Sequence, residues 1–321
     1  MQKQKKHRVI PIFMPMLACP HRCIYCNQQV ISGTHSLPSD SEVVAMVDTY
    51  LSTMDPNAEK RVAFFGGSFT CLPMNVQNRY LDLVQPYVAD GRISGVQLST
   101  RPDYIDEEIL ENLKSHGVTL VELGAQSLDD GILEACGRGH TVEDVRRSSS
   151  LILQHGIELG LQMMVGLPGD TREKSMNTAR LIHEFGAMHT RIYPTLVVEG
   201  TRLAEMYRAG IYKPLAIEDA VDWCKDLYLY FTSVNVNVLR MGLHPAKDLC
   251  DGTGFIAGPF HPSFKELVMT SVWKDRIARL VAESGGGSVV VEVPERDINY
   301  AVGYNSSNRK LFPQAVFKVR S

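Results

Sequence analysis

The residues best suited to chemistry lie near the N-terminus, where three cysteines occur within eight residues. Cys19, Cys23 and Cys26 have the spacing C-x3-C-x2-C. A structural zinc site uses four protein ligands, and a cubane iron-sulfur cluster takes one thiolate at each of its four irons. Three thiolates therefore leave one iron without a protein ligand. The spacing predicts a cluster with one position open to a small molecule.

Two other uses of these thiols have to be weighed. His21 would complete a zinc site of three cysteines and one histidine. It sits between the cysteines, however, where a tight loop would struggle to direct it at the same metal, and Pro20 restricts the backbone further. A disulfide is disfavoured because the chain has seven cysteines, an odd number, and no secretory signal. The cluster is the favoured interpretation.

With Tyr25 as the aromatic residue before the last cysteine, this motif resembles that of the radical S-adenosylmethionine (SAM) superfamily. The resemblance implies that Cys19, Cys23 and Cys26 hold a 4Fe-4S cluster whose fourth iron chelates the amino and carboxylate groups of SAM. It also implies reductive cleavage of SAM to methionine and a 5′-deoxyadenosyl radical. We therefore expect a reductase or a ferredoxin- or flavodoxin-type protein as electron donor.

Strand-length apolar runs alternate with helix-period segments through the first two thirds of the chain. Strands are expected at residues 8–14, 61–65, 95–99, 118–123, 157–164 and 189–193. Six strands that are each followed by a helix predict an α/β fold with a parallel sheet and right-handed crossovers. The family resemblance adds that this sheet forms a partial (β/α)6 TIM-like barrel. The cysteine loop would then lie at the C-terminal rim, where barrel active sites are built.

The chain is expected to divide into a radical SAM core, residues 1–235, and a smaller α+β appendage, residues 236–321. A loop-rich stretch with two histidines, His244 and His261, opens the appendage. This stretch either closes over the mouth of the barrel and selects the substrate or packs as a turn-rich element. The sequence leaves both interpretations open.

A glycine-rich segment follows the second predicted strand directly. Gly66 and Gly67 allow close backbone approach to a ligand, and Ser68 comes next. The alternative is a tight turn between strand and helix. In the radical SAM family the corresponding segment contacts the amino group of SAM, so the resemblance favours Gly66, Gly67 and Ser68 as cofactor-binding residues.

Polar residues at later strand ends resemble two branches of the family, the Elongator catalytic subunit and the oxygen-independent coproporphyrinogen oxidase. There, a glutamine matched by Gln126 and an arginine matched by Arg138 help to bind SAM. A guanidinium suits the methionine carboxylate because it donates two parallel hydrogen bonds to a carboxylate. Gln162, in the fifth strand, precedes a Gly-Leu-Pro-Gly segment. In both branches, residues next to this segment approach the adenosine of SAM. We therefore expect Gln126, Arg138 and Gln162 to bind the cofactor.

The sequence departs from the coproporphyrinogen pattern at two positions. Ser99 replaces a glutamate and Gln162 replaces an aspartate. We therefore prefer an Elongator-like enzyme with an RNA-related substrate, which by resemblance would be tRNA. A tetrapyrrole enzyme is the alternative function. The Elongator subunit also carries an acetyltransferase domain, which we do not expect here. A non-catalytic iron-sulfur sensor would explain the cysteines but not the other motifs.

Composition bounds the remaining expectations. The 321-residue chain has 44% hydrophobic residues, 21% charged residues and a net charge of -3, as soluble globular proteins do. No signal peptide or membrane span is expected, and a reducing cytoplasm suits an oxygen-sensitive cluster. The role of two further cysteines in glycine-flanked loops, Cys71 and Cys250, is left open between packing and donation of a hydrogen atom.

Overall fold

The computed structural model describes residues 7–14, 19, 21–27, 36–245, 247–285 and 287–320. In this part of the chain one parallel sheet has the strand order β1-β2-β3-β4-β5-β6-β8. Its strands are β1 (His7–Met14), β2 (Glu59–Gly66), β3 (Gly95–Thr100), β4 (Val118–Gln126), β5 (Glu158–Val165), β6 (His189–Pro194) and β8 (Asn237–Met241).

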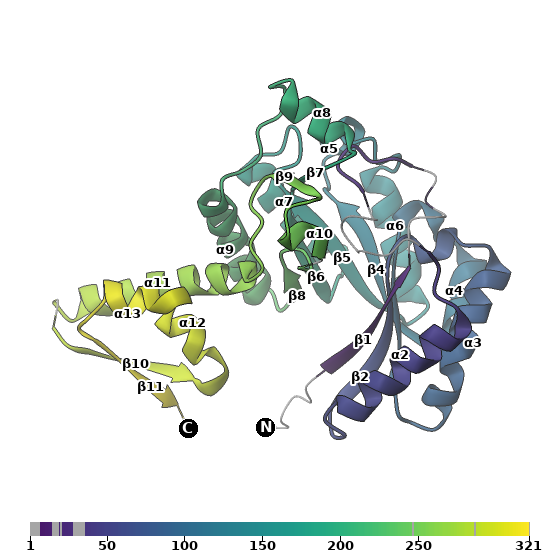
Figure 1. Cartoon of the computed structure of the whole chain (residues 1–321), viewed down its shortest axis with the longest axis horizontal. Coiled ribbons are helices and arrows are strands. Elements are labelled where there is room, and N and C mark those ends of the chain that lie inside the picture. The colour runs from purple at the N-terminus through teal and green to yellow at the C-terminus, as the bar shows by residue number, and fades with distance from the viewer. Residues whose placement is uncertain are drawn as a thin grey trace.

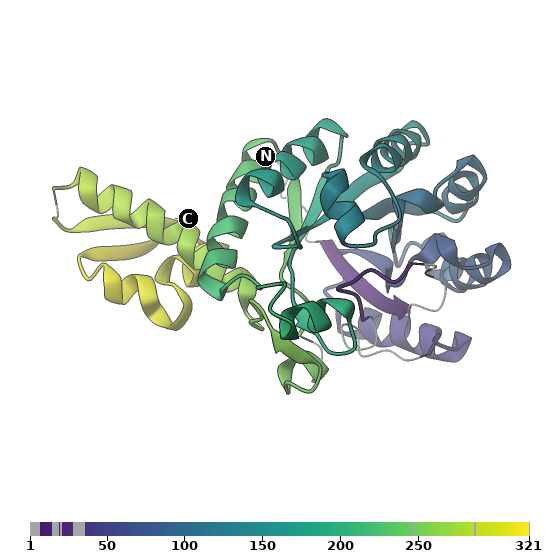
Figure 2. The same ribbon diagram turned by 90° about the horizontal axis from the view of Figure 1, so that it is seen from above.

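Helices cover the outer, convex side of this sheet, which curls into a half-barrel (Figures 1 and 2). They are α2 (Asp40–Thr53), α3 (Met74–Ala89), α4 (Glu107–Ser115), α6 (Val142–Gln154), α7 (Arg172–Glu184) and α9 (Ile217–Ser233). Two shorter helices, α5 (Asp130–Ala135) and α8 (Arg202–Arg208), lie beyond the carboxyl ends of the strands (Figure 1). The predicted α/β partial barrel is confirmed.

The helices begin where local chemistry supplies the missing hydrogen bonds. At the start of α6 the Thr141 hydroxyl accepts from the Asp144 amide, while the Asp144 carboxylate accepts from the Thr141 amide. Ser39 and Glu42 form the same reciprocal capping box at the start of α2. Such boxes satisfy two backbone donors that the first helical turn leaves unpaired.

The main core lies between the sheet and these helices. Strand residues such as Val62, Phe64, Leu98 and Leu161 have no exposed surface there. Residues that alternate with them along the strands, such as Arg61, Gln97 and Gln162, line the interior of the half-barrel, because successive side chains of a strand point to opposite faces.

The sheet contains one strand more than the sequence analysis predicted. The expected boundary placed residues 236–321 in the appendage, but β8 pairs with β6 and extends the main sheet beyond residue 235. Alternating valines such as Val236 and Val238 indicate a strand without identifying its partner, which explains the difference. The division of the chain into two domains stays a prediction.

The C-terminal region is a small α+β unit beside the half-barrel, as predicted (Figure 1). The parallel pair β10 (Val289–Pro294) and β11 (Ala315–Arg320) packs on the long helix α11 (Phe264–Glu283). The first half of α11 contributes Phe264 and Val268 to the main core, and its second half contributes Trp273 and Ile277 to the core of the appendage. One helix thus joins both cores. The unit is completed by α12 (Ile298–Val302) and α13 (Ser307–Leu311).

A short antiparallel pair lies at the carboxyl end of the sheet. It consists of β7 (Val197–Val198) and β9 (Phe255–Ala257), and α10 (Lys247–Cys250) precedes β9 in the chain. None of the helices in the described part of the chain combines the length and the apolar character needed to cross a bilayer.

Candidate active site

The cysteine loop that follows β1 is held against α5 and α8. The Ile24 amide donates to the carbonyl of Cys136, directly after α5, at 3.1 Å. The Leu203 amide of α8 donates to the Ile24 carbonyl at 2.8 Å. Cys23, Ile24 and Tyr25 are buried in a separate apolar cluster with these helices. Packing and backbone bonds therefore fix the loop at the C-terminal rim, where the sequence analysis expected it.

The three predicted metal-ligating thiols lie along this loop. The Cys26 amide donates to the Cys23 carbonyl at 3.0 Å, which makes a tight turn between the last two cysteines. Cys23 is buried, Cys19 and Cys26 are partly exposed, and none of the three forms a disulfide. Among the residues with described positions, no three His, Cys, Asp or Glu side chains converge on one metal ion. A four-iron cluster takes each thiolate at a different iron and does not require such convergence.

The surroundings of Cys23 fit a thiolate-held group. The Arg138 guanidinium donates to the Cys23 sulfur at 3.3 Å, which places a cation beside one of the three predicted ligands. The Tyr25 hydroxyl and the Arg138 Nε are buried with no hydrogen-bond partner among the described residues. Buried polar atoms normally have partners, so these two have hydrogen-bonding capacity left for a ligand. Burial also raises the pKa of Tyr25 well above its ordinary value, which keeps it a neutral phenol.

His21 has another environment than the zinc interpretation requires. Its Nε2 lies 3.7 Å from an Asp103 carboxylate oxygen. Its ring also lies over Gly139, where an added Cβ would come within 2.2 Å of the imidazole. Gly139 thus leaves room for the ring, which lies between two segments: the connection from α5 to α6, and the loop after β3.

The glycine-rich segment follows β2 next to the end of β1. Gly66 has φ +103°, and the Gly67 amide donates to the Met14 carbonyl at 2.7 Å. A Cβ at Gly66 would come within 2.5 Å of the same carbonyl oxygen. Only glycine suits this conformation and contact. Ser68, the next predicted residue, precedes a short 3-10 helix, Phe69–Cys71.

Gln126 ends β4 in an unusual backbone conformation. Its φ is +67°, and the Ser127 amide donates to the Ala125 carbonyl at 2.8 Å, which closes a three-residue turn around it. A non-glycine residue in such a turn is strained, and strain of this kind concentrates at functional sites. A Cβ at Gly124 would lie 2.8 Å from the Gln126 amide nitrogen and 3.5 Å from the Arg138 guanidinium. Gly124 therefore lets these two predicted residues approach each other.

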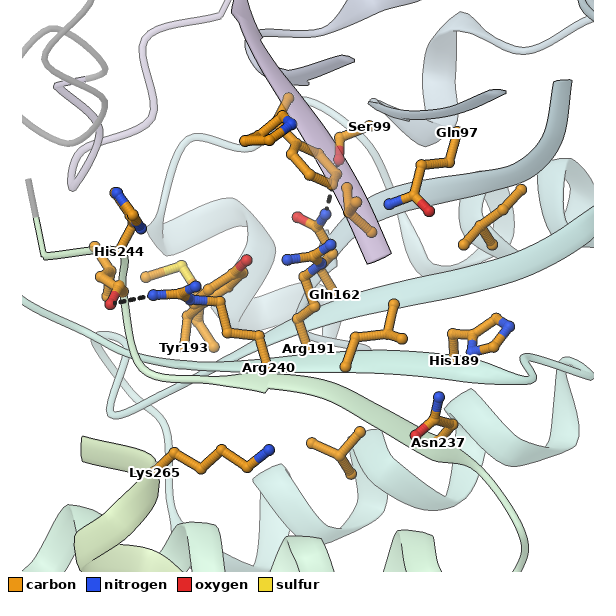
Figure 3. A pocket seen from close by; sticks show the side chains of 18 of the residues that line it. Gln97, Ser99, Gln162, His189, Arg191, Tyr193, Asn237, Arg240, His244 and Lys265 are labelled. Carbon is orange, nitrogen blue, oxygen red and sulfur yellow. Dashed lines mark hydrogen bonds between the residues drawn. The ribbon is translucent and has the colours of Figure 1, made fainter. Parts of the chain in front are cut away.

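Gln162 belongs to a polar layer inside the half-barrel, which we define as Ser99, Glu122, Gln162, Arg191 and Arg240. Its amide donates to the Ser99 hydroxyl at 3.0 Å and to the Glu122 carboxylate at 3.3 Å. The two positions that depart from the coproporphyrinogen pattern are thus hydrogen-bonded to each other (Figure 3). Gln162 lines the same cavity as Cys26, although its bonds hold it within the layer.

Glu122 and Arg191 form the buried ion pair of this layer. Arg191 Nη2 donates to Glu122 Oε1 at 2.9 Å, and its Nε donates to the other carboxylate oxygen. The guanidinium also lies 4.6 Å from the centre of the Phe65 ring. Burial alone would lower the pKa of Arg191, but Tyr193 and Glu122 outweigh it and hold the pKa above its ordinary value.

A second buried network was not predicted from the sequence. Arg101 is 2% exposed, pairs bidentately with Asp103 at 2.9 Å and donates to the Arg138 carbonyl. Burial lowers the pKa of the adjacent His140 to about 3, with help from the charges of Arg138 and Arg101. Arg101 thus positions the backbone of the arginine that contacts Cys23. The only sequence signal was the Arg-Pro-Asp turn after the third strand, and it did not indicate burial.

One large cavity connects these features. Its volume is about 1700 Å³, and it is lined by Tyr25, Cys26, Gly66, Gln126 and Gln162 together with residues of β6, β8 and the appendage. Small-molecule sites commonly measure about 300–1000 Å³. The cavity is therefore large enough for a cofactor and a substrate together.

The residues whose roles were left open lie in different places. His244 lines the cavity, whereas the His261 ring packs edge-on against Tyr304 of the appendage at 5.1 Å. Cys71 is partly buried, and burial and the nearby Cys19 raise the pKa of its thiol to about 12. Cys250 is exposed.

A parallel half-barrel with an open three-cysteine loop at its C-terminal rim defines the class of radical SAM enzymes. Comparison with known protein families agrees, since residues 14–182 match the radical SAM superfamily and residues 188–274 match its Radical_SAM C-terminal domain. This chain belongs to the radical SAM superfamily. Enzymes of this superfamily use a 4Fe-4S cluster and SAM and need a reductant.

The relatives found by sequence are Elongator-like proteins. The tRNA uridine(34) acetyltransferase of Methanocaldococcus jannaschii is 30% identical over 254 residues, which cover 67% of this chain and 47% of that protein. Elongator complex protein 3 of Homo sapiens is 33% identical over 259 residues, with coverage of 67% and 47%. The chain thus spans about half the length of these curated relatives. The resemblance to the Elongator-like branch is confirmed.

A solved structure agrees with the fold. The archaeal Methanocaldococcus infernus Elp3, with its N-terminus deleted, superimposes with a TM-score of 0.63 over 88% of this chain and 64% of that chain. The sequence identity is 22%.

Proposed function

We propose that this radical SAM enzyme abstracts a hydrogen atom from an RNA substrate related to tRNA. Cys19, Cys23 and Cys26 would hold the 4Fe-4S cluster. When bound, the cluster supplies the electron that cleaves SAM to methionine and a 5′-deoxyadenosyl radical. The observation that carries this proposal is the contact of Arg138 with the Cys23 sulfur beside two unpartnered buried polar atoms.

The remaining predicted residues would position SAM. Gly66 and Gly67 would bring the backbone close to the methionine amino group, with Ser68 beside them. Arg138 supplies a planar guanidinium for the carboxylate, and Gln126 lies next to it across Gly124. Gln162 is hydrogen-bonded within the polar layer and would form the floor beneath the adenosine.

The relatives support an RNA substrate, since one of them is named for uridine 34 of tRNA. Ser99 and Gln162 occupy the positions of the two acidic residues of the porphyrin pattern, and they are hydrogen-bonded to each other. The absence of those two acidic side chains disfavours a tetrapyrrole substrate. We infer a reductase or a ferredoxin- or flavodoxin-type protein as electron donor.

The test is anaerobic reconstitution with iron and sulfide, reduction with dithionite, addition of SAM and chromatographic detection of 5′-deoxyadenosine. We expect 5′-deoxyadenosine from the wild type and none from Cys23→Ala. Cys224→Ala is the matched control, because Cys224 is buried in α9 within the main core. A cluster that forms while SAM is neither bound nor cleaved would refute the catalytic proposal. If the wild type cleaves SAM, addition of tRNA should increase SAM consumption and alter the tRNA nucleoside profile.

A further inference from the structure

The polar layer contains two neighbouring arginines that differ in their partners. Arg191 on β6 and Arg240 on β8 face each other in the strand register. Glu122 neutralises Arg191. Arg240 instead donates from Nε to the Gly242 carbonyl and from Nη2 to the Leu243 carbonyl, both at 2.9 Å. Within the described residues, no carboxylate lies at ion-pair distance from Arg240.

Two other arginines of the sheet and its loops have a carboxylate partner in the described structure. Arg61 pairs with Glu158 at 2.8 Å, and Arg101 pairs with Asp103 at 2.9 Å. Charges removed from water are normally paired, because desolvation is costly. Burial lowers the pKa of Arg240, and the neighbouring Arg191 charge acts in the same direction. A partly buried guanidinium without an acidic partner is therefore ready to receive an anion.

The geometry fixes this guanidinium and leaves donors available. An arginine has five N–H groups, and the two carbonyl bonds of Arg240 occupy two of them. The carbonyls bend the side chain towards the carboxyl end of β8, near His244 and Tyr193 (Figure 3). All three residues line the large cavity. An oxyanion in the cavity would thus meet a preorganised donor.

The position of Arg240 indicates that this anion belongs to the substrate. Arg138, the residue proposed for the SAM carboxylate, follows β4, whereas Arg240 lies three strands further along the sheet. The cavity also has an excess of cationic side chains, since among the described residues only Glu158 and Asp297 supply carboxylates to its lining. The cations are Arg8, Arg61, Arg191, Arg240, Lys265 and Arg296.

We propose that Arg240 binds a phosphate of the substrate. One carboxylate would use a single cation, whereas a nucleotide strand brings one negative charge with each residue and suits a lining with several cations. This inference rests on the proposed RNA-related function and adds a contact point to it. A phosphodiester of an RNA strand and the phosphate of a free nucleotide share this chemistry.

The test uses the full chain, reconstituted anaerobically, with two probes. Fluorescence anisotropy measures binding of a labelled RNA hairpin with a uridine in its loop over a range of salt concentrations. Calorimetry compares uridine 5′-monophosphate with uridine. The variants are Arg240→Gln, Arg240→Lys and the control Arg279→Gln, an exposed position on α11 that does not line the cavity.

We expect Arg240→Gln to weaken RNA binding about 10- to 100-fold, as loss of a charge-assisted hydrogen bond does. The slope of log K against log salt should fall by about 0.7, the value for one phosphate of a single strand. Arg240→Lys should keep most of the slope because it keeps the charge, and Arg279→Gln should match the wild type. A merely structural role for Arg240 would leave the slope unchanged.

The outcomes separate this inference from the proposed function. If RNA binds with the same affinity and slope in Arg240→Gln, the phosphate site is refuted while an RNA substrate stands. If RNA fails to bind but uridine 5′-monophosphate binds at least tenfold more tightly than uridine, and only with Arg240 present, the site stands and the substrate is a free nucleotide. If neither probe depends on Arg240, the inference is wrong.

Discussion

The ion pair between Glu122 and Arg191 makes a quantitative prediction about stability. Replacing Glu122 by alanine removes the only carboxylate that pairs with Arg191 among the described residues. It also removes an acceptor from Gln162. The guanidinium would remain inside the half-barrel without a counter-ion.

The size of the effect follows from burial. The Glu122 side chain is 1% exposed and that of Arg191 is 12% exposed. Two unit charges about 4 Å apart attract by ~4 kcal/mol at an effective dielectric constant of 20. Removing one partner of a buried pair typically costs about 3–5 kcal/mol, whereas replacing both by apolar residues is often close to neutral. We therefore expect Glu122→Ala to lower the free energy of unfolding by about 3–5 kcal/mol.

The assay is urea denaturation followed by circular dichroism, with two comparison variants. Glu199→Ala breaks the pair with Arg208, whose side chains are 49% and 55% exposed, and should cost less than about 1 kcal/mol. The double variant Glu122→Met with Arg191→Met should recover most of the stability lost in Glu122→Ala. A loss below about 1 kcal/mol in Glu122→Ala, or no recovery in the double variant, would refute the reasoning.

Three further predictions concern the backbone, pH and helix caps. Gly66→Ala should cost more stability than Gly91→Ala, because both glycines have positive φ but only at Gly66 would the Cβ meet a backbone oxygen. Gly91→Ala should lower the free energy of unfolding by about 1–2 kcal/mol. Equal losses of unfolding free energy in the two variants, measured by urea denaturation, would contradict the contact at Gly66. The pKa of His140 is lowered to about 3 in the folded chain, whereas in the unfolded chain it has its ordinary value of about 6.5. Between about pH 6.5 and about pH 3 the unfolded chain therefore binds a proton that the folded chain does not, and the free energy of unfolding should fall with falling pH by at most about 1.4 kcal/mol per pH unit. His140→Asn should show a shallower pH dependence over that range, and an unchanged slope would assign it to other groups. Thr141→Ala should cost about 1 kcal/mol by loss of the α6 cap, and an unchanged denaturation midpoint would show that the cap contributes nothing.

Local patterns predicted the elements of the half-barrel closely. The apolar run expected at residues 189–193 is β6, His189–Pro194. Ser39 caps α2, and Glu42 three residues later completes the capping box. Both depend on neighbours in the sequence, and such neighbours are visible in the sequence alone.

Features that depend on distant partners escaped the sequence analysis. The pairing of Glu122 with Arg191 joins residues on β4 and β6, and neither residue differs by type from a surface residue. The same holds for Arg101, whose burial depends on Asp103 and on the carbonyl of Arg138. The seventh strand, β8, comes in addition to the six strands expected, because its pairing with β6 is a property of the folded chain.

The sheet has two edges, β1 and β8, that do not pair with each other in the described part of the chain. A closed barrel fixes its diameter through strand number and stagger. A sheet with separate edges lacks that constraint, and the side chains of its interior set its curvature instead. Substitutions at a few positions of the polar layer would therefore widen or narrow the mouth without altering the strand order, and one backbone design accommodates substrates of different size.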